Sequence, residues 1–200
     1  MPSDKSRPVM FARQAAELDY AFERNGWTPD DVKWLSTGDN LARILEVRRG
    51  SAEIKSVEHV IDCDADPFIP EGWRVEEHKK SGSFKWDPKQ VQFYLSELQR
   101  KGKPIKGNKL RKELAGKPVL NANVLDYLLK HPHLIPEEWK EKTNGYTTYI
   151  FFWGTIYRGP YGYLYVRSLC WYGGGWSWGY DWLGHDWHAD YPAALRASVT

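Results

Sequence analysis

The apolar positions near the N-terminus recur at the spacing of amphipathic helices. Between residues 9 and 24 they fall on one helical face, and Asn25-Gly26 follows as a stop signal. Thr28 and Pro29 have the character of the N-cap and first residue of a second helix. A third helix is predicted over residues 39–49. We therefore predict a helical module over residues 1–53.

The middle of the chain, residues 54–142, has a more mixed pattern. Two short strands are expected between residues 57 and 78, where Pro and Gly interrupt the apolar positions. Residues 87–102 predict a helix, because apolar side chains fall on one face between an Asp-Pro start and a Gly stop. Two shorter helices are predicted to begin at Asn108 and Asn121, since Asn is a favourable N-cap.

From residue 143 to residue 200 the hydrophobic period shortens to that of a β-strand. Three alternating runs, at 147–158, 161–172 and 176–183, are separated by turns that contain Gly or Pro. The stretch from Tyr146 to Tyr191 holds 6 of the 11 Trp and 9 of the 12 Tyr residues. The pattern predicts a three-stranded antiparallel meander packed on the preceding helices. The predicted fold class is therefore α+β.

One face of this predicted meander is aromatic and the other is mainly aliphatic. Large exposed apolar patches are rare in soluble monomers, so we expect helices to bury most of the aromatic face. The third run has an edge-like alternation with Ser, Gly and Asp, and its Trp residues are therefore expected to be the most open. Trp and Tyr rings stack on bases and on the apolar faces of sugars. The candidate ligand-stacking residues are Trp176, Trp178, Tyr180 and Trp182.

The charge is unevenly distributed, although 28 basic and 26 acidic residues leave a net charge of only +2. Between Lys79 and Lys117 there are twelve Lys or Arg residues against three acids, a local excess of +9. The two short helices between Asn108 and Lys130 are compatible with a helix-turn-helix that exposes Asn121, Asn123, Asp126 and Lys130. The alternative is an ordinary solvated surface, and the second helix carries no Arg.

A non-enzymatic binding protein with RNA or DNA as its partner is the leading functional hypothesis. Phosphate neutralisation by Lys and Arg supplies most of the affinity of such proteins. The candidate nucleic-acid-binding residues are Lys101, Lys103, Lys106, Lys109, Arg111, Lys112, Asn121 and Asn123. A carbohydrate-binding or protein-interaction module that uses the Trp and Tyr face is an alternative hypothesis.

Three alternating carboxylates provide the enzyme alternative. If the chain is extended here, Asp62, Asp64 and Asp66 project to one face about 6.5 Å apart. Such a spacing suits a hard divalent cation, and it would allow a metal-dependent hydrolase of phosphate esters. The competing interpretation is an acidic strand end before the Asp66-Pro67 turn. No catalytic residue and no cofactor is assigned.

The remaining motifs carry weaker chemistry. His185 and His188 are three residues apart, but the surrounding Gly and Trp favour a loop with surface or hydrogen-bonded histidines. Cys63 and Cys170 have neither a disulfide framework nor metal-ligand spacing, which favours a reducing compartment. No 18-residue apolar run or signal-peptide core is present, so we expect a cytoplasmic protein without a membrane partner.

Several longer segments carry a resemblance to known sequences. They are Leu110-Arg-Lys-Glu-Leu, Leu120-Asn-Ala-Asn-Val-Leu-Asp-Tyr-Leu-Leu, Ile135-Pro-Glu-Glu-Trp and Phe151-Phe-Trp-Gly-Thr-Ile-Tyr-Arg. With the Ile61 to Pro67 segment, they resemble a family of uncharacterised bacterial proteins found in candidate-phylum genomes, over most of the chain. The resemblance implies a recurring domain and implies no activity, cofactor or catalytic residue.

Overall fold

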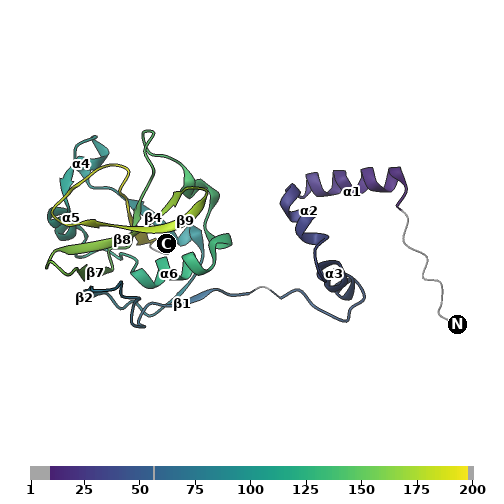
Figure 1. The fold of residues 1–200 in the computed structure, drawn as a ribbon, viewed down its shortest axis with the longest axis horizontal. Helices are drawn as coiled ribbons and strands as arrows, with labels where there is room; N and C mark the ends of the chain where they lie inside the picture. Colours follow the sequence, from purple (N-terminus) through teal and green to yellow (C-terminus); the bar gives the residue numbers. More distant parts are fainter. Residues whose placement is uncertain (1–9, 56, 198–200) are drawn as a thin grey trace. The chain divides into compact units, whose positions relative to one another are not determined.

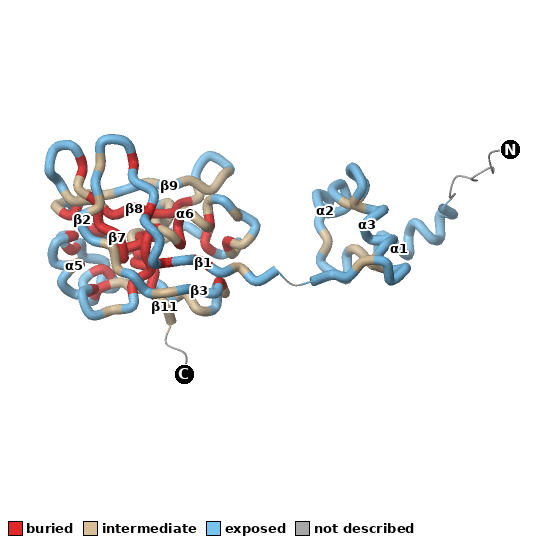
Figure 2. The backbone as a smooth tube through the Cα atoms, turned by 90° about the horizontal axis from the view of Figure 1, so that it is seen from below, coloured by how far each residue is buried: buried red, intermediate tan, exposed pale blue. Residues whose placement is uncertain are grey.

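The computed structural model describes residues 10–55 and 57–197. The chain divides into two compact units, Met1–Val57 and Glu58–Thr200 (Figure 1). Figure 2 shows that the buried positions concentrate in the second unit. The fold is mixed α+β, as the sequence predicts.

The first unit contains the three predicted helices: α1 (Ala12–Arg24), α2 (Pro29–Leu35) and α3 (Asn40–Arg48). Thr28 caps α2 as expected, because its hydroxyl accepts from the backbone N–H of Asp31 and the Asp31 carboxylate accepts from the Thr28 N–H in return. None of the three helices contains a buried residue.

The second unit is built on a seven-stranded sheet with the order β2-β7-β8-β6-β11-β4, in which β9 also pairs with β8. Its strand pairs are antiparallel except for β6 and β11, which are parallel. The strands are β2 (Arg74–His78), β4 (Val91–Tyr94), β6 (Ile150–Phe151), β7 (Thr155–Arg158), β8 (Leu164–Tyr172), β9 (Gly175–Trp182) and β11 (Ala193–Arg196).

Two short ladders and several short helices complete the second unit. The ladders pair β1 (Val60–Asp62) with β3 (Ser83–Lys85), and β5 (Ile105–Lys106) with β10 (Asp186–Trp187). The helices are α4 (Glu97–Arg100), α5 (Gly107–Leu114) and α6 (Ala122–Lys130), with 3-10 turns η1 (Pro88–Gln90), η2 (Pro132–Leu134) and η3 (Glu137–Lys140).

The predicted three-stranded meander is only partly observed, because its first run forms two separate strands, β6 and β7. The break contains Gly154, where an added Cβ would lie 2.8 Å from Cα of Asn121. The register shows the effect, since Phe151 pairs with Ser168 and Tyr157 pairs with Tyr165. Ser168 and Tyr165 are three residues apart on β8, so Phe151 and Tyr157 lie on opposite faces of the sheet. β8 and β9 pair over almost their whole length.

Helices cover both faces of the sheet. On one face α6 packs over Ile150 and Leu169. On the other face α5 contributes to a separate core around Phe151 and Val166. Val166 and Leu169 point in opposite directions from β8, so α5 and α6 lie on opposite sides of the sheet.

The prediction of one continuous helix over residues 87–102 is wrong, because this range contains η1, β4 and α4. Asp87 accepts from the backbone N–H of Lys89 and caps the single turn η1, after which β4 pairs with β11. Ser96 then begins the four-residue α4 through a capping box with Gln99. Apolar residues at these positions fit a helix and a short strand equally well, and pairing with a distant strand decided the outcome.

Of the two predicted N-caps in this unit, one is confirmed. Asn121 accepts from the backbone N–H of Asn123 at the start of α6. Asn108 is not a cap, because α5 already begins at Gly107. The N–H groups of Gly107 and Asn108 donate instead to the carbonyls of His185 and Leu183, so neither needs a side-chain cap.

Candidate ligand-binding surfaces

Pairing of β8 with β9 gathers aromatic side chains on one face of the sheet. Directly paired residues share a face, and the pairs include Arg167 with Tyr180 and Leu169 with Trp178. The segment before β2 adds two more rings from far away in the sequence. We use the term aromatic surface for Phe68, Trp73, Tyr165, Trp178 and Tyr180.

The rings of the aromatic surface touch one another but remain open to solvent. The centroid of Trp73 lies 4.8 Å from that of Tyr165 and 5.0 Å from that of Tyr180. The Trp178 centroid lies 6.2 Å from that of Tyr180 and 6.5 Å from that of Phe68. Phe68 is 55% exposed, Trp178 38% and Tyr180 56%. This is a contiguous surface of half-open rings.

Arg167 lies beneath two of these rings. Arg167 is only 1% exposed. The carbon atom Cζ of its guanidinium lies 5.0 Å from the Phe68 ring centroid and 4.5 Å from that of Trp178. Two hydrogen bonds, of 3.1 and 2.7 Å, join it to the Asp126 carboxylate on α6. A cation held between two rings fixes their positions, and the ion pair neutralises its charge.

A second set of contacts holds the segment that carries Phe68 and Trp73. The Tyr157 hydroxyl donates to the Phe68 carbonyl over 3.0 Å, and burial raises the pKa of this phenol. Arg158 follows Tyr157 on β7 and therefore points to the opposite face, where it forms two hydrogen bonds to Glu76; this pairing lowers the pKa of the Glu76 carboxyl. The hydrogen bond from Tyr157 and the Arg158–Glu76 pair therefore fix the two ends of this segment.

The expectation that helices bury most of Trp176, Trp178, Tyr180 and Trp182 is wrong, because Trp178 and Tyr180 are exposed and the other two are partly exposed. The reason is that helix α6 is shorter than strand β9 and cannot cover all of it. The nine residues of α6 span about 14 Å, whereas the eight residues of β9 span about 27 Å. The expectation that the Trp residues of this run are partly open is confirmed.

The predicted basic residues divide into two groups. Lys101 pairs with Glu97, Lys106 with Asp186 and Arg111 with Glu77. Lys103, Lys109 and Lys112 are exposed and make no ion pair within residues 10–55 and 57–197. Lys109 and Lys112 lie on α5, on the side of the sheet opposite to α6 and the aromatic surface.

The predicted exposure of Asn121 and Asn123 on a recognition helix is wrong. Asn121 is 1% exposed, and its amide donates to the carbonyls of Cys63 and Lys79 over 2.8 and 3.0 Å. The Asn123 amide donates to the carbonyls of Asp62 and Ala65, both over 2.8 Å. Helix α6 packs on the sheet, so Asn121, Asn123 and Asp126 bond to the protein itself, whereas Lys130 at the end of the helix is exposed as predicted.

The predicted metal site at Asp62, Asp64 and Asp66 is also wrong. The chain bends after Asp62, whose carboxylate accepts from the N–H groups of Asp64 and Ala65. The Asp64 carboxylate accepts from the Gly82 N–H over 2.8 Å. In the part of the chain that the structure describes, no three His, Cys, Asp or Glu residues are grouped to hold a metal ion.

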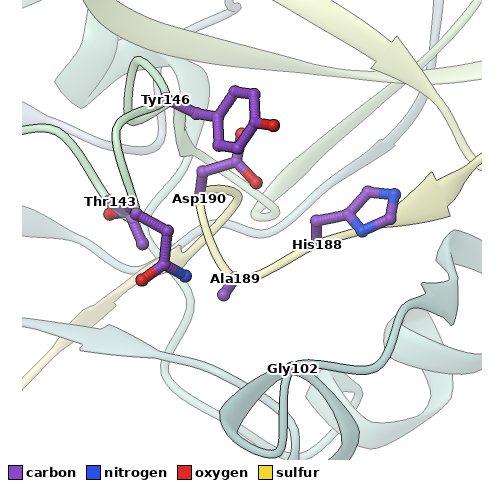
Figure 3. A pocket seen from close by; sticks show the side chains of 7 residues that line it. Gly102, Thr143, Tyr146, His188, Ala189 and Asp190 are labelled. Atoms are coloured by element: carbon purple, nitrogen blue, oxygen red, sulfur yellow. The ribbon is translucent and has the colours of Figure 1, made fainter.

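The two C-terminal histidines have different surroundings. His185 makes a 2.6 Å hydrogen bond with Asp181, so its side chain is engaged. His188 lines a cleft of about 390 Å³ between three segments of the chain (Figure 3). The cleft is lined by Gly102, Thr143, Asn144, Tyr146, His188, Ala189 and Asp190.

Several of these residues were missed by the sequence interpretation. Phe68 and Trp73 lie in an irregular segment, and no local pattern places them beside β8 and β9. Arg167 did carry a signal, because the alternation in the second predicted run places it on the same strand face as the aromatic residues. An Arg at such a position indicates a buried ion pair or a stacked cation.

Comparisons with models of protein families, with curated proteins and with solved structures found no match to this chain. The resemblance to a bacterial family therefore stays a prediction. Within the described ranges, every helix is too short or too polar to cross a bilayer. The fold and the site define a mixed α+β protein with an open aromatic surface.

Proposed function

We propose that this is a non-enzymatic binding protein and that the aromatic surface binds a neutral carbohydrate chain. The observation that carries the proposal is the contiguous cluster of half-open Trp, Tyr and Phe rings on the β8–β9 face. Such rings offer apolar faces to a sugar ring and polar tips to its hydroxyls.

Electrostatics favours a neutral ligand over a polyanion at this surface. The cation beneath it, Arg167, is committed to Asp126. In the hollow beside Phe68, the carboxylates of Asp62, Asp66 and Asp126 outnumber the ammonium group of Lys130. Phosphate contacts require cations that can exchange their counterions for phosphates. The exposed lysines of α5 lie on the other side of the sheet and do not supply them.

A saccharide titration followed by intrinsic Trp fluorescence tests the proposal. Neutral oligosaccharides of glucose, xylose and N-acetylglucosamine are the probes, with a single-stranded oligonucleotide and a proline-rich peptide as comparators. At least one saccharide should shift the emission in a saturable way. Replacing Tyr180 by Ala should weaken binding by about fivefold or more, since it removes one ring contact.

Tyr161→Ala is the matched control for Tyr180→Ala. Tyr161 is 87% exposed and lies outside the aromatic surface, so its loss should leave the affinity unchanged. Equal weakening by both variants would contradict the assignment of the surface. Saturable binding of the oligonucleotide or the peptide alone would contradict the ligand class.

Nucleic-acid binding remains a second candidate, supported by Lys103, Lys109 and Lys112, which are exposed and form no ion pair with a residue that the structure describes. Fluorescence polarisation at low salt with labelled single- and double-stranded oligonucleotides tests it. Changing all three to Gln should weaken binding and reduce the slope of log affinity against log salt by about 2 to 3. The control changes the paired Lys101 and Lys106 to Gln, which should have a smaller effect. Absence of binding to either oligonucleotide removes this candidate.

A further inference from the structure

The cleft of Figure 3 has walls that the backbone holds firmly. One wall is a two-residue hairpin, in which Thr143 and Tyr146 exchange both backbone hydrogen bonds, of 2.9 and 3.0 Å. The turn residues Asn144 and Gly145 have φ of 52° and 83°, as a type I′ turn requires. The Thr143 hydroxyl is bonded to that of Thr148 over 2.8 Å.

The opposite wall, residues 188–190, is fixed by its carbonyl groups. The buried Gln99 donates to the His188 carbonyl over 2.7 Å, and the Tyr149 N–H donates to the Asp190 carbonyl over 2.8 Å. The side chains of this wall take no part in these bonds. They are therefore available to a ligand while their backbone stays in place.

Four polar side chains in the cleft are uncommitted. Asn144, Tyr146, His188 and Asp190 form no side-chain hydrogen bond or ion pair with another residue in the described parts of the chain. This contrasts with Asp62, Asn121 and His185, whose side chains form hydrogen bonds within the protein. Polar groups that converge on a cleft without internal partners are a feature of ligand sites.

The charge lining the cleft is negative. Among the described residues that line it, Asp190 is the only carboxylate and none is Lys or Arg. Lys103 and Lys142 are exposed and are neighbours of lining residues in the sequence, but neither is among the residues that line the cleft. Burial, with the charges of Asp181 and Asp190, raises the pKa of the adjacent Tyr191 to about 12. The negative charges of Asp181 and Asp190, which disfavour a phenolate anion at Tyr191, attract a cation.

We propose that this cleft is a second binding site, which takes a small organic cation with a primary or quaternary ammonium group. The Asp190 carboxylate supplies the counter-charge, and the 70%-exposed Tyr146 ring supplies a face for the cation. Figure 3 shows Tyr146 on the hairpin wall, and Asp190 and His188 on the segment that forms the opposite wall. Asn144 and His188 are placed to bond the rest of the ligand. The site shares no residue with the aromatic surface.

A protein-observed NMR titration of the full chain at low ionic strength tests this proposal. The probes are choline, its neutral isostere 3,3-dimethylbutan-1-ol, and the tripeptide Gly-Lys-Gly. Choline or the tripeptide should shift the resonances of residues 143–146 and 188–190, and the tighter of the two identifies a quaternary ammonium compound or a peptide lysine as the source. The neutral isostere should not bind.

Asp190→Asn should weaken binding of the cation by about tenfold or more, because it removes a charge-assisted contact without changing the shape of the side chain. Asp186→Asn is the matched control, since Asp186 is an exposed carboxylate of the same segment that pairs with Lys106. The spectra also report whether each variant is folded. Three results would overturn the proposal: no binding of either cation, equal binding of the neutral isostere, or an unchanged affinity in Asp190→Asn.

Discussion

At the scale of single residues, Arg167 links the core to the candidate ligand surface. Its guanidinium is held by Asp126 on α6 and lies against the rings of Phe68 and Trp178. Removing one member of a buried ion pair leaves the other charge without its partner. The geometry of the aromatic surface therefore depends on a buried charge, and we propose that Arg167 acts as a positioning residue.

Arg167→Met should lower the free energy of unfolding toward the lower end of about 3 to 5 kcal/mol, because the side chain of Asp126 is partly exposed. Urea denaturation measures this change. The double variant Arg167→Met, Asp126→Leu should recover part of the loss, because no uncompensated charge remains. Strictly additive losses from Arg167→Met and Asp126→Leu would show that the pair is not coupled and would contradict this role.

At the scale of elements, the local sequence was sufficient to predict features that depend on residues close together in the sequence. The Thr28 cap, the Pro at the start of α2 and the Asn121 cap of α6 all acted as the sequence predicts. Residues 91–94 were predicted to be helical but form β4, because β11 pairs with them from a hundred residues away. Such a partner leaves no mark on a local pattern, so helix and strand could not be separated there.

Helices α1, α2 and α3 contain no buried residue, and two of them are shorter than ten residues. Isolated helices shorter than about 12 to 15 residues are marginal in water. In the full chain, far-UV circular dichroism should therefore show loss of helix at low urea, before the near-UV aromatic signal is lost. A single transition that coincides for both signals would contradict independent, weak stability of the first unit.

At the scale of the whole molecule, the sequence located the aromatic face but not the complete site. The pairing of β8 with β9 follows from the alternation and the three glycines between the two runs. Phe68 and Trp73 complete the aromatic surface from an irregular segment, and only the tertiary structure brings them there. The basic residues were found by counting charges, whereas their ion pairs depend on distant acids such as Glu77 and Asp186.

The most direct test of the central claim is ¹⁹F NMR of the full chain labelled with 5-fluorotryptophan, recorded with and without the saccharide that gives the largest fluorescence change. Replacement of single Trp residues by Phe assigns the resonances. The claim predicts that Trp73 and Trp178 shift on binding, while the fully buried Trp187 on the opposite face keeps its position. Unchanged resonances of Trp73 and Trp178 at saturating saccharide would show that the aromatic surface is not the ligand site.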